Sequence, residues 1–253
     1  MVAGGATLGR ALDILDLLGG EEATANGGLG VVRIADLLGR EKSQVSRALK
    51  TLSARGFVDR DPETREYRLG WRFYGLAART GQSRLVVLAP PLLRELVASL
   101  EETAHLSVLE GAHVLTLLSV PSPRLLQASD WSGLRVPAHC TSAGRALLLD
   151  EDRESLDVRF SGTRTRRAID ELERHLGRAR QNGYAVVNGG FEPGLVGVAA
   201  PVRDFRGFIV AAVNVSGPEF RFGVRAERAG PVLRRAANEL SDRLGAGRGE
   251  GDV

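Results

Sequence analysis

The apolar positions at the start of the chain first follow a helical period. They predict a helix from about residue 8 to 18, with Thr7 as its cap, Gly19-Gly20 as its stop, and an inner face of Leu8, Ala11, Leu12, Leu15 and Leu18. A glycine-rich loop over residues 20–30 and a short helix over 31–38 follow, and another helix begins near Lys42. Three short helical segments in succession indicate a small helical domain.

The helix that begins near Lys42 has two distinct faces. At about 100° per residue, Val45, Leu49 and Leu52 share an apolar face, whereas polar and basic residues occupy the other. After Gly56 the period becomes extended, with segments 57–60 and 66–69 on either side of a turn at 61–64. Helix, turn, helix and hairpin in this order predict a winged helix-turn-helix over residues 1–70.

The rest of the chain predicts a linker helix and a second domain. Residues 71–83 read as a helix with apolar residues on two sides, which is typical of a helix between two surfaces and predicts dimerisation. Beyond Pro90-Pro91 we expect a helix, then strands at 105–109, 114–120 and 125–128, helices at 142–149 and 170–182, strands at 184–187, 195–202 and 208–215, and a closing helix at 224–244. Strands and helices mixed without strict alternation favour an α+β class for residues 84–253, with 246–253 as a disordered tail.

Composition adds modest information. The 253 residues carry a net charge of +3, and lysine occurs only at Lys42 and Lys50. Between residues 31 and 55, however, six basic residues face two acidic ones, which is a local excess at the predicted helix-turn-helix. We find no apolar segment of membrane-spanning length and no leader pattern, so we expect a cytoplasmic protein without a membrane partner. A single cysteine, Cys140, argues against a disulfide framework or a thiolate zinc site.

The polar face of the second helix and the hairpin carry the predicted DNA contacts. Arg47 suits guanine and Gln44 suits adenine, and the remaining side chains suit phosphates or base edges. The full set of predicted contacts is Arg33, Lys42, Ser43, Gln44, Ser46, Arg47, Lys50, Thr51, Arg65 and Arg68. A basic helix face can also be an ordinary solvated surface. The succession of helix, turn, helix and hairpin favours DNA.

Several segments resemble the IclR family of bacterial transcriptional regulators. They include Ile34-Ala35-Asp36-Leu37-Leu38, Lys42-Ser43-Gln44-Val45-Ser46-Arg47, Gly56-Phe57-Val58-Asp59-Arg60-Asp61, Pro137-Ala138-His139-Cys140-Thr141-Ser142-Ala143-Gly144-Arg145, Phe191-Glu192-Pro193-Gly194 and Val213-Asn214-Val215-Ser216-Gly217-Pro218. The likeness runs from about residue 8 to 244. It implies a GAF-like effector-binding domain, homodimers on palindromic double-stranded DNA, and pairing of dimers into tetramers.

A candidate effector site lies at the start of the helix near Ser142. Free amides at a helix N-terminus attract a carboxylate, although Thr141 capping the helix with nothing bound is an equally good interpretation. The resemblance implies that this turn lies in the effector pocket, that Leu125 lies on the pocket wall, and that Asn214 and Ser216 lie on a facing strand. The full set of predicted effector contacts is Leu125, Trp131, Cys140, Ser142, Ala143, Gly144, Val187, Gly197, Asn214 and Ser216.

The nature of the effector follows from two of these positions. At Val187 and Gly197 many relatives carry an acid and a cysteine, so this pocket is expected to be less polar and to take a more apolar acid, such as an aromatic one. Trp131 either closes over the pocket or is a structural core residue. Thiol or zinc chemistry at Cys140 is disfavoured, and His105, His113 and His175 read as ordinary structural or surface residues.

These observations predict a DNA-binding transcriptional regulator whose operator affinity responds to a small organic acid, with repression favoured over activation. We expect no cofactor and no metal. The enzyme motifs Gly-x-Ser-x-Gly, His-Glu-x-x-His and the phosphate loop do not occur, so no enzymatic activity is expected. The alternative is a small-molecule-binding or enzymatic GAF-like domain whose winged helix binds another protein.

Overall fold

The computed structural model describes residues 3–77, 83–128, 131–162 and 166–246, and the chain divides into two compact units, Met1–Ser83 and Arg84–Val253. Each unit has its own buried apolar cluster, so each is described by itself. Within the described residues, no helix is both long and apolar enough to cross a membrane.

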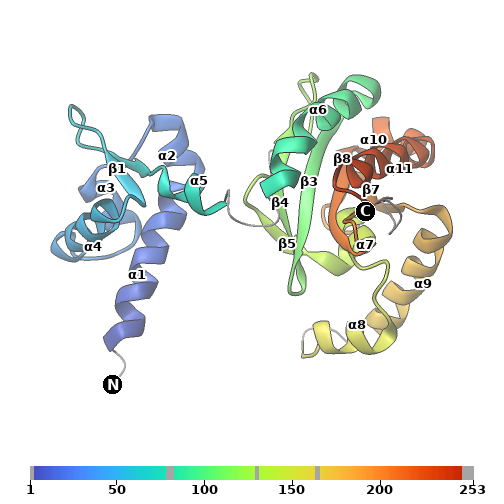
Figure 1. The fold of residues 1–253 in the computed structure, drawn as a ribbon, viewed down its shortest axis with the longest axis horizontal. Helices are drawn as coiled ribbons and strands as arrows, with labels where there is room; N and C mark the ends of the chain where they lie inside the picture. The colour runs from blue at the N-terminus through green and yellow to red at the C-terminus, as the bar shows by residue number, and fades with distance from the viewer. Residues whose placement is uncertain (1–2, 78–82, 129–130, 163–165, 247–253) are drawn as a thin grey trace, which may run out of the picture. The chain divides into compact units, whose positions relative to one another are not determined.

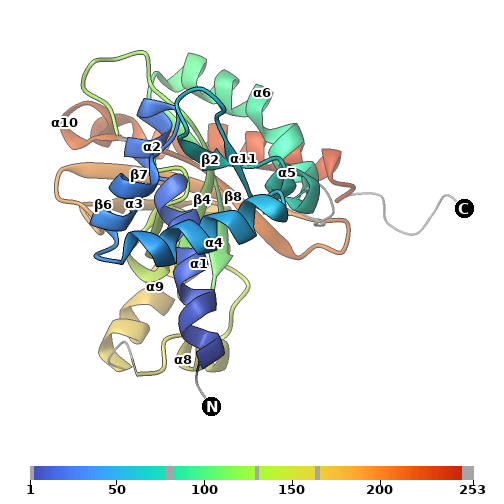
Figure 2. The ribbon, with the colours of Figure 1, turned by 90° about the vertical axis from the view of Figure 1, so that its left-hand side faces the viewer.

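The N-terminal unit is a winged helix-turn-helix (Figure 1). Its elements are α1 (Ala3–Leu18), α2 (Glu21–Asn26), α3 (Val31–Leu37), α4 (Lys42–Ala54), β1 (Val58–Arg60), β2 (Tyr67–Leu69) and α5 (Arg72–Ala77). Its core holds Ile14, Ile34 and Leu49, each 1% exposed or less, together with Val58 of the hairpin. Figure 2 shows α4 crossing α1, against which it packs.

Three details of this unit differ from the prediction. Leu8 and Leu12, expected on the inner face of the first helix, are 63% and 51% exposed. The first helix begins at Ala3, so Thr7 lies inside the helix and not at its N-cap, since no proline interrupts the segment before it. The segment expected as a glycine-rich loop contains α2, whose first turn carries Glu21 and Glu22 and so suits the positive end of the helix dipole. Gly27, with φ of 75°, ends α2 in the left-handed conformation.

The wing is held at its turn by one carboxylate. Asp61 accepts hydrogen bonds from the backbone N–H groups of Glu63 and Thr64, both at 2.9 Å. These bonds favour the charged form and lower the pKa of the Asp61 carboxyl. The bridge between Leu29 and Tyr67 then ties the hairpin to the segment before α3, with N···O distances of 2.9 Å in both directions.

The C-terminal unit is built on one six-stranded antiparallel sheet of order β5-β4-β3-β8-β7-β6. The strands are β3 (Thr103–Glu110), β4 (His113–Val120), β5 (Arg135–Pro137), β6 (Ala185–Asn188), β7 (Leu195–Arg203) and β8 (Ile209–Pro218). The helices are α6 (Ser83–Leu100), η1 (Ala138–Cys140), α7 (Ser142–Leu147), α8 (Arg153–Arg159), α9 (Arg166–Asn182), α10 (Glu219–Phe222), η2 (Gly223–Arg225) and α11 (Ala226–Arg243).

Helices cover both faces of this sheet. One apolar cluster joins α6 and α11 to β3, β7 and β8, and the other joins α7, α8 and α9 to the opposite face. The fold class expected from the sequence, a winged helix-turn-helix followed by an α/β domain of mixed helices and strands, is confirmed.

Three expectations for this unit are wrong. The sequence predicts a helix only beyond Pro90 and Pro91, yet α6 runs through both prolines. One face of α6 is buried on the sheet, with Leu85, Ala89, Leu93 and Leu96. This burial offsets the backbone hydrogen bonds that the prolines remove. Residues 125–128 form no strand, because residues 135–137 pair with β4 at that edge instead. The sequence analysis also missed α8, although Asp152 caps it by accepting from the Ser155 N–H at 2.9 Å.

A buried carboxylate fastens the end of the sheet to the C-terminal elements. Glu102, immediately before β3, is 0% exposed and is bound by Arg221 of α10 in a two-bond fork of 2.7 and 2.6 Å, with Arg225 at 3.1 Å. A buried acid is tolerable when several donors satisfy it. This contact therefore fixes α10 and η2 beside the first residues of β3.

The short helix α7 lies unusually close to the turn before it. A methyl group added to Gly144 would stand 1.9 Å from the carbonyl oxygen of Ala138, which is backbone of η1 and cannot rotate away. Only glycine therefore fits at this position. By contrast, a methyl group added to Gly177 of α9 would meet no atom within 4 Å.

We predict that Gly144→Ala destabilises the C-terminal unit by about 1–3 kcal/mol or more, because the added carbon forces the backbone of η1 and α7 apart. Gly177→Ala is the matched control and should stabilise by up to about 1 kcal/mol. Urea unfolding followed by Trp131 fluorescence measures both, in a Trp71→Phe background. Equal midpoints for Gly144→Ala and the parent would contradict the close approach.

Candidate functional site

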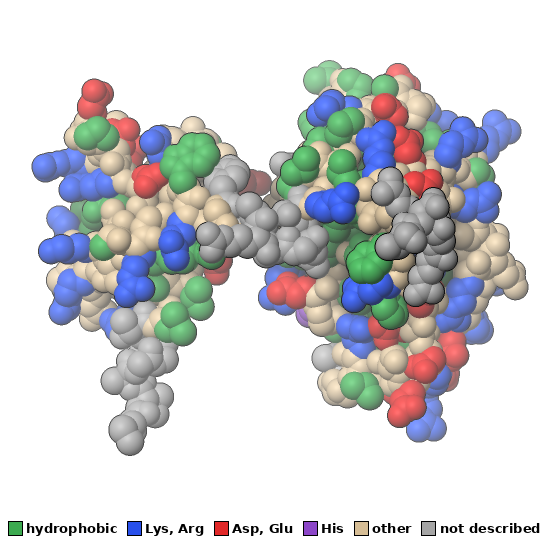
Figure 3. Space-filling view, in the orientation of Figure 1, with side chains coloured by type: hydrophobic (Ala, Val, Ile, Leu, Met, Phe, Trp, Pro, Cys, Tyr) green, Lys and Arg blue, Asp and Glu red, His purple; other side chains and the backbone are tan. Residues whose placement is uncertain are grey.

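The exposed face of α4 is the first candidate site. Lys42, Ser43, Ser46, Arg47, Lys50 and Thr51 are all exposed on it, opposite the buried Val45, Leu49 and Leu52. The side chains are ordered along the helix: Arg47 Nε donates to the Ser43 carbonyl at 3.2 Å, and Thr51 Oγ1 donates to the Arg47 carbonyl at 3.1 Å. Figure 3 shows Lys and Arg side chains gathered on this unit over α3 and α4.

Two residues expected among the DNA contacts are engaged within the unit. The Gln44 Oε1 atom accepts from Arg10 Nη1 of α1 at 2.8 Å, and Gln44 is half-buried. Arg33 of α3 forms a two-bond ion pair with Glu22 of α2, at 2.7 and 3.1 Å, which lowers the pKa of the Glu22 carboxyl. The charge of Arg33 is thus already compensated, whereas the exposed cations of α4 form no ion pair with a described residue.

The wing carries the other two predicted contacts. Arg65 is exposed at the turn with φ of 63°, and Arg68 is exposed on β2 opposite Asp59 in the strand register. Arg60 of β1, which the sequence analysis did not single out, lies over the Tyr67 ring at 5.4 Å. Three arginines therefore lie on one small hairpin.

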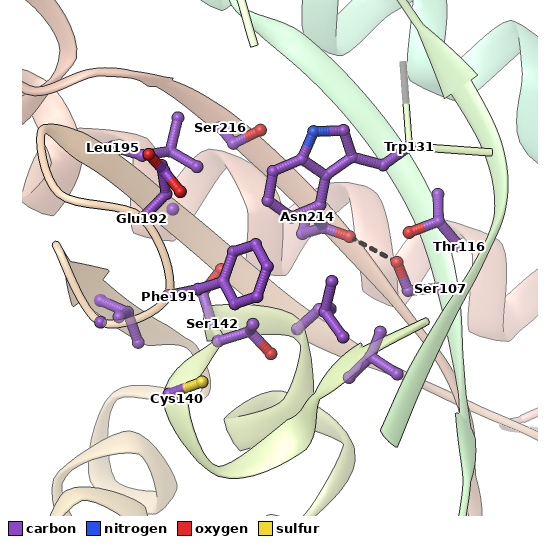
Figure 4. Close-up of a pocket in the computed structure, with 17 residues that line it drawn as sticks. Ser107, Thr116, Trp131, Cys140, Ser142, Phe191, Glu192, Leu195, Asn214 and Ser216 are labelled. Atoms are coloured by element: carbon purple, nitrogen blue, oxygen red, sulfur yellow. Dashed lines mark hydrogen bonds between the residues drawn. The ribbon is translucent and has the colours of Figure 1, made fainter. Parts of the chain in front are cut away.

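The second candidate site is a pocket in the C-terminal unit (Figure 4). Strands β3, β4 and β8, the start of α7 and the segment between β6 and β7 surround it, with a cavity volume of about 50 Å³. Its lining comprises Ser107, Val114, Thr116, Trp131, Val136, Cys140, Thr141, Ser142, Ala143, Val187, Gly190, Phe191, Glu192, Leu195, Gly197, Asn214 and Ser216. The cavity is several times larger than one water molecule requires, so its size suits a small ligand.

One end of the pocket is polar. Ser107 Oγ donates to Asn214 Oδ1 at 3.0 Å, which leaves the Asn214 NH₂ group as a donor, and Thr116 adds a hydroxyl from β4. Ser216 is bonded to His105 Nε2 at 2.9 Å, and His105 Nδ1 is bonded to Ser119 at 2.8 Å. Because His105 is 1% exposed, it holds the Ser216 hydroxyl in place from inside the sheet.

Two aromatic side chains line the pocket near these polar groups. Trp131 and Phe191 meet edge to face, with ring centroids 5.3 Å apart and planes at 69°. In Figure 4 both rings lie over the strand that carries Asn214 and Ser216. Val114, Val136 and Val187 complete the apolar wall. The pocket can therefore accept a flat apolar body together with a group that forms hydrogen bonds.

Eight of the ten residues expected at the effector site line this pocket, and two do not. Leu125 is fully exposed and does not line the pocket. The structure therefore corrects its predicted place on the pocket wall. Gly144 lies behind the lining, and its amide is not free, since it donates to Thr141 Oγ1 at 3.1 Å. Thr141 thus caps α7, as one of the two interpretations required, and Ser142 and Ala143 of the first turn line the pocket.

Sequence reasoning missed Ser107, Thr116 and Phe191. Ser107 and Thr116 are small polar residues within predicted strands, and strand pairing alone brings Thr116 beside Ser107 and Ser107 within bonding distance of Asn214. The Phe191 position belongs to a segment quoted for the family resemblance, which was a usable signal. Cys140 lines the pocket with its Sγ donating to the Pro137 carbonyl at 3.5 Å, and no metal-binding group of three or more His, Cys, Asp or Glu occurs in the described ranges.

Together the two units define a class of protein: a winged-helix DNA-binding regulator joined to a domain with a small-molecule pocket. The sequence matches the IclR helix-turn-helix domain over residues 7–62 and the bacterial transcriptional regulator IclR C-terminal domain over residues 78–242. The chain belongs to the IclR family of transcriptional regulators.

Individual relatives agree with this assignment. The HTH-type transcriptional regulator BhcR of Paracoccus denitrificans is 35% identical over 92% of this chain and 85% of its own length. The regulator KdgR of Dickeya chrysanthemi is 31% identical over 93% of this chain and 79% of its own length. An IclR homologue of Microbacterium hydrocarbonoxydans, solved in complex with 4-hydroxybenzoate, is similar with a TM-score of 0.76 and 25% identity, covering 94% of this chain and 98% of its own.

The His105–Ser216 bond yields a prediction. Ser216→Ala removes the hydroxyl that His105 Nε2 bonds in the buried strand pair, and should lower the free energy of unfolding by about 1–3 kcal/mol. Ser99→Ala, on the exposed surface of α6, should change it by less than about 0.5 kcal/mol. Urea unfolding compares the two, and an equal loss in both variants would mean that the bond does not stabilise the sheet.

Proposed function

We propose that this regulator represses transcription by binding a palindromic operator as a homodimer, and that a small aromatic carboxylic acid bound in the pocket changes its operator affinity. The observation that carries the proposal is the pocket itself, whose lining combines two aromatic rings with hydrogen-bonding hydroxyl and amide groups. A dimer seated across a promoter excludes the polymerase, which is the reason for assigning repression.

The DNA contacts follow from exposure and charge. We propose that α4 enters the major groove with Lys42, Ser43, Ser46, Arg47, Lys50 and Thr51, and that Arg65 and Arg68 of the wing reach the backbone or the minor groove. Arg47 is the strongest candidate for a guanine because its guanidinium can bond two acceptors on one base edge. Gln44 can bond adenine only if it releases Arg10. Arg33 can contact DNA only if it releases Glu22.

The effector class follows from the lining. No described lining residue is a Lys or Arg, so a carboxylate would be received by neutral donors, namely the Asn214 amide, hydroxyl groups and backbone amides at the start of α7. Trp131 and Phe191 suit a ring, since edge and face contacts between aromatic groups are favourable. The relative solved with 4-hydroxybenzoate supports this class.

Dimerisation follows from apolar residues left exposed in the N-terminal unit. Leu8 and Leu12 on α1 are 63% and 51% exposed, and Trp71 before α5 is 75% exposed. Such residues are typical of a surface that a second copy covers. The proposed dimer of dimers rests on the family alone.

For DNA binding, we predict that Arg47→Ala weakens operator binding about ten-fold or more, since it removes a two-bond base contact worth about 1–3 kcal/mol. Arg33→Ala is the matched control, because its charge is already paired with Glu22, and its effect should stay below about three-fold. Fluorescence anisotropy with the promoter beside the gene, at several salt concentrations, measures both. Unchanged binding by Arg47→Ala would place the DNA on another surface.

For the effector, we predict that 4-hydroxybenzoate changes the fluorescence of Trp131, because this residue lines the pocket. The measurement uses a Trp71→Phe background, in which Trp131 is the single remaining tryptophan. Asn214→Leu should weaken this binding by about ten-fold through loss of a hydrogen-bond donor. A non-aromatic acid such as acetate should bind less well. A titration in which Asn214→Leu binds as tightly as the parent would exclude this pocket as the acid site.

A reporter assay tests the direction of control. Deleting the gene should raise expression from the adjacent promoter, and an acid that binds the pocket should raise it in the intact strain but not in one carrying Asn214→Leu. Lower expression on deletion would identify an activator.

A further inference from the structure

The C-terminal unit has a second hollow, which we call the α9–β6 groove. It lies between α7, α9 and β6, with a volume of about 450 Å³, and its charged and polar lining residues are Arg145, Glu171, His175, Arg178, Asn182, Tyr184, Asn188 and Glu227. Val187 and Gly190 line both this groove and the pocket, so the two hollows share a wall. The sequence analysis assigned no ligand-binding role to any residue of the groove except Val187, and it read His175 as an ordinary structural or surface residue.

Arg145 is the unusual residue of this groove. Its Nε atom is buried and has no hydrogen-bond partner in the described parts of the chain. Burial lowers the pKa of its guanidinium, and the nearby Cys140 and Glu171 only partly counteract this effect. A buried cation that lacks a close partner is costly, and a bound anion would compensate it.

Two carboxylates also line the groove. Glu171 lies 3.7 Å from His175 Nε2 and pairs with the imidazole when it is protonated, and Glu227 accepts from the Tyr184 hydroxyl at 3.3 Å. Arg178 on α9 is exposed and, like Arg145 on α7, lies near enough to His175 to lower the pKa of its imidazole, for which burial is the largest cause. Cations from two helices thus surround one imidazole.

We propose that the α9–β6 groove is a second ligand site of the C-terminal unit, which binds a tetrahedral dianion, either free phosphate or a phosphate ester, through Arg145, Arg178 and His175. Donors that approach from two helices suit a group with acceptor oxygens in several directions. The pocket is unsuitable for such a dianion, because its described lining offers no cationic side chain. The two hollows therefore differ in the charge of the ligand that they select.

Titration calorimetry of the full chain with inorganic phosphate, at pH 7.5 and constant ionic strength, tests the site. Arg178→Gln should weaken phosphate binding at least about five-fold. Arg174→Gln removes the same charge from an exposed position of the same helix outside the groove, and should leave binding within about two-fold. Equal affinities for the two variants, or no phosphate binding by the parent, would overturn the proposal.

Two further arms separate this site from the pocket and identify the occupant. Asn214→Leu, which alters the pocket, should leave phosphate binding unchanged, and a loss there would place the phosphate in the pocket and overturn the proposal. Glycerol 3-phosphate binding more tightly than inorganic phosphate would identify a phosphate ester as the occupant, and the reverse order would identify the free ion. Either order supports the groove.

Sulfate provides a test of His175, because it stays a dianion across the pH range. The groups that face His175 are Arg145 from α7 and Glu171 and Arg178 from α9, with Tyr184 and Glu227 elsewhere in the groove. A dianion favours the protonated imidazole, so sulfate affinity should rise as the pH falls from 8 to 5.5. His175→Gln should abolish this rise, and a rise of the same size in His175→Gln would exclude the histidine from the site.

Discussion

The arrangement of the C-terminal unit depends on how closely α7 approaches its neighbours. Gly144 leaves no space for a side chain against the Ala138 carbonyl, and a methyl group added to Gly197 on β7 would lie 2.6 Å from Ser142 Oγ. The two missing side chains therefore let the first turn of α7 lie directly against η1 at Gly144 and against the sheet at Gly197. This contact places Ser142 and Ala143 at the pocket and Arg145, one turn further on, at the groove behind it. Closeness of backbone to backbone thus positions both hollows.

Buried polar groups within this unit are of two kinds. His105 bonds serines on two neighbouring strands, and Glu102 is satisfied by two arginines, so both act as fixed cross-links between elements. Arg145 differs, because its Nε atom is buried without a partner. Among the described residues this is shared only by Arg159 Nε, whose guanidinium is otherwise bound by Glu151 and the Gly111 carbonyl. Since most buried polar groups in proteins are paired, Arg145 marks a place where a ligand can supply the missing acceptor.

The N-terminal unit leaves one face of α4 exposed to solvent. Its core is small, and α1, α3 and the hairpin cover only the apolar side of α4. The Asp61 turn and the Leu29–Tyr67 bridge fix the wing without using the basic residues of α4. The exposed cations of α4 are therefore available to a polyanion, whereas Arg33 and Gln44 are partly engaged within the unit.

The sequence by itself determined the order of elements, the winged helix-turn-helix and the family, because apolar periodicity and short motifs are local properties. It also found eight of the pocket residues, since segments such as those of Ser142, Asn214 and Ser216 are recognisable. Only the tertiary structure decided that Leu125 lies outside the pocket, that α6 runs through two prolines, and that Thr116 lies beside Ser107, which bonds Asn214. The partners of Arg33 and Gln44 and the surroundings of Arg145 were equally hidden. These features depend on which strands pair and which surfaces bury each other, in some cases across more than a hundred residues in sequence, and no local pattern records that choice.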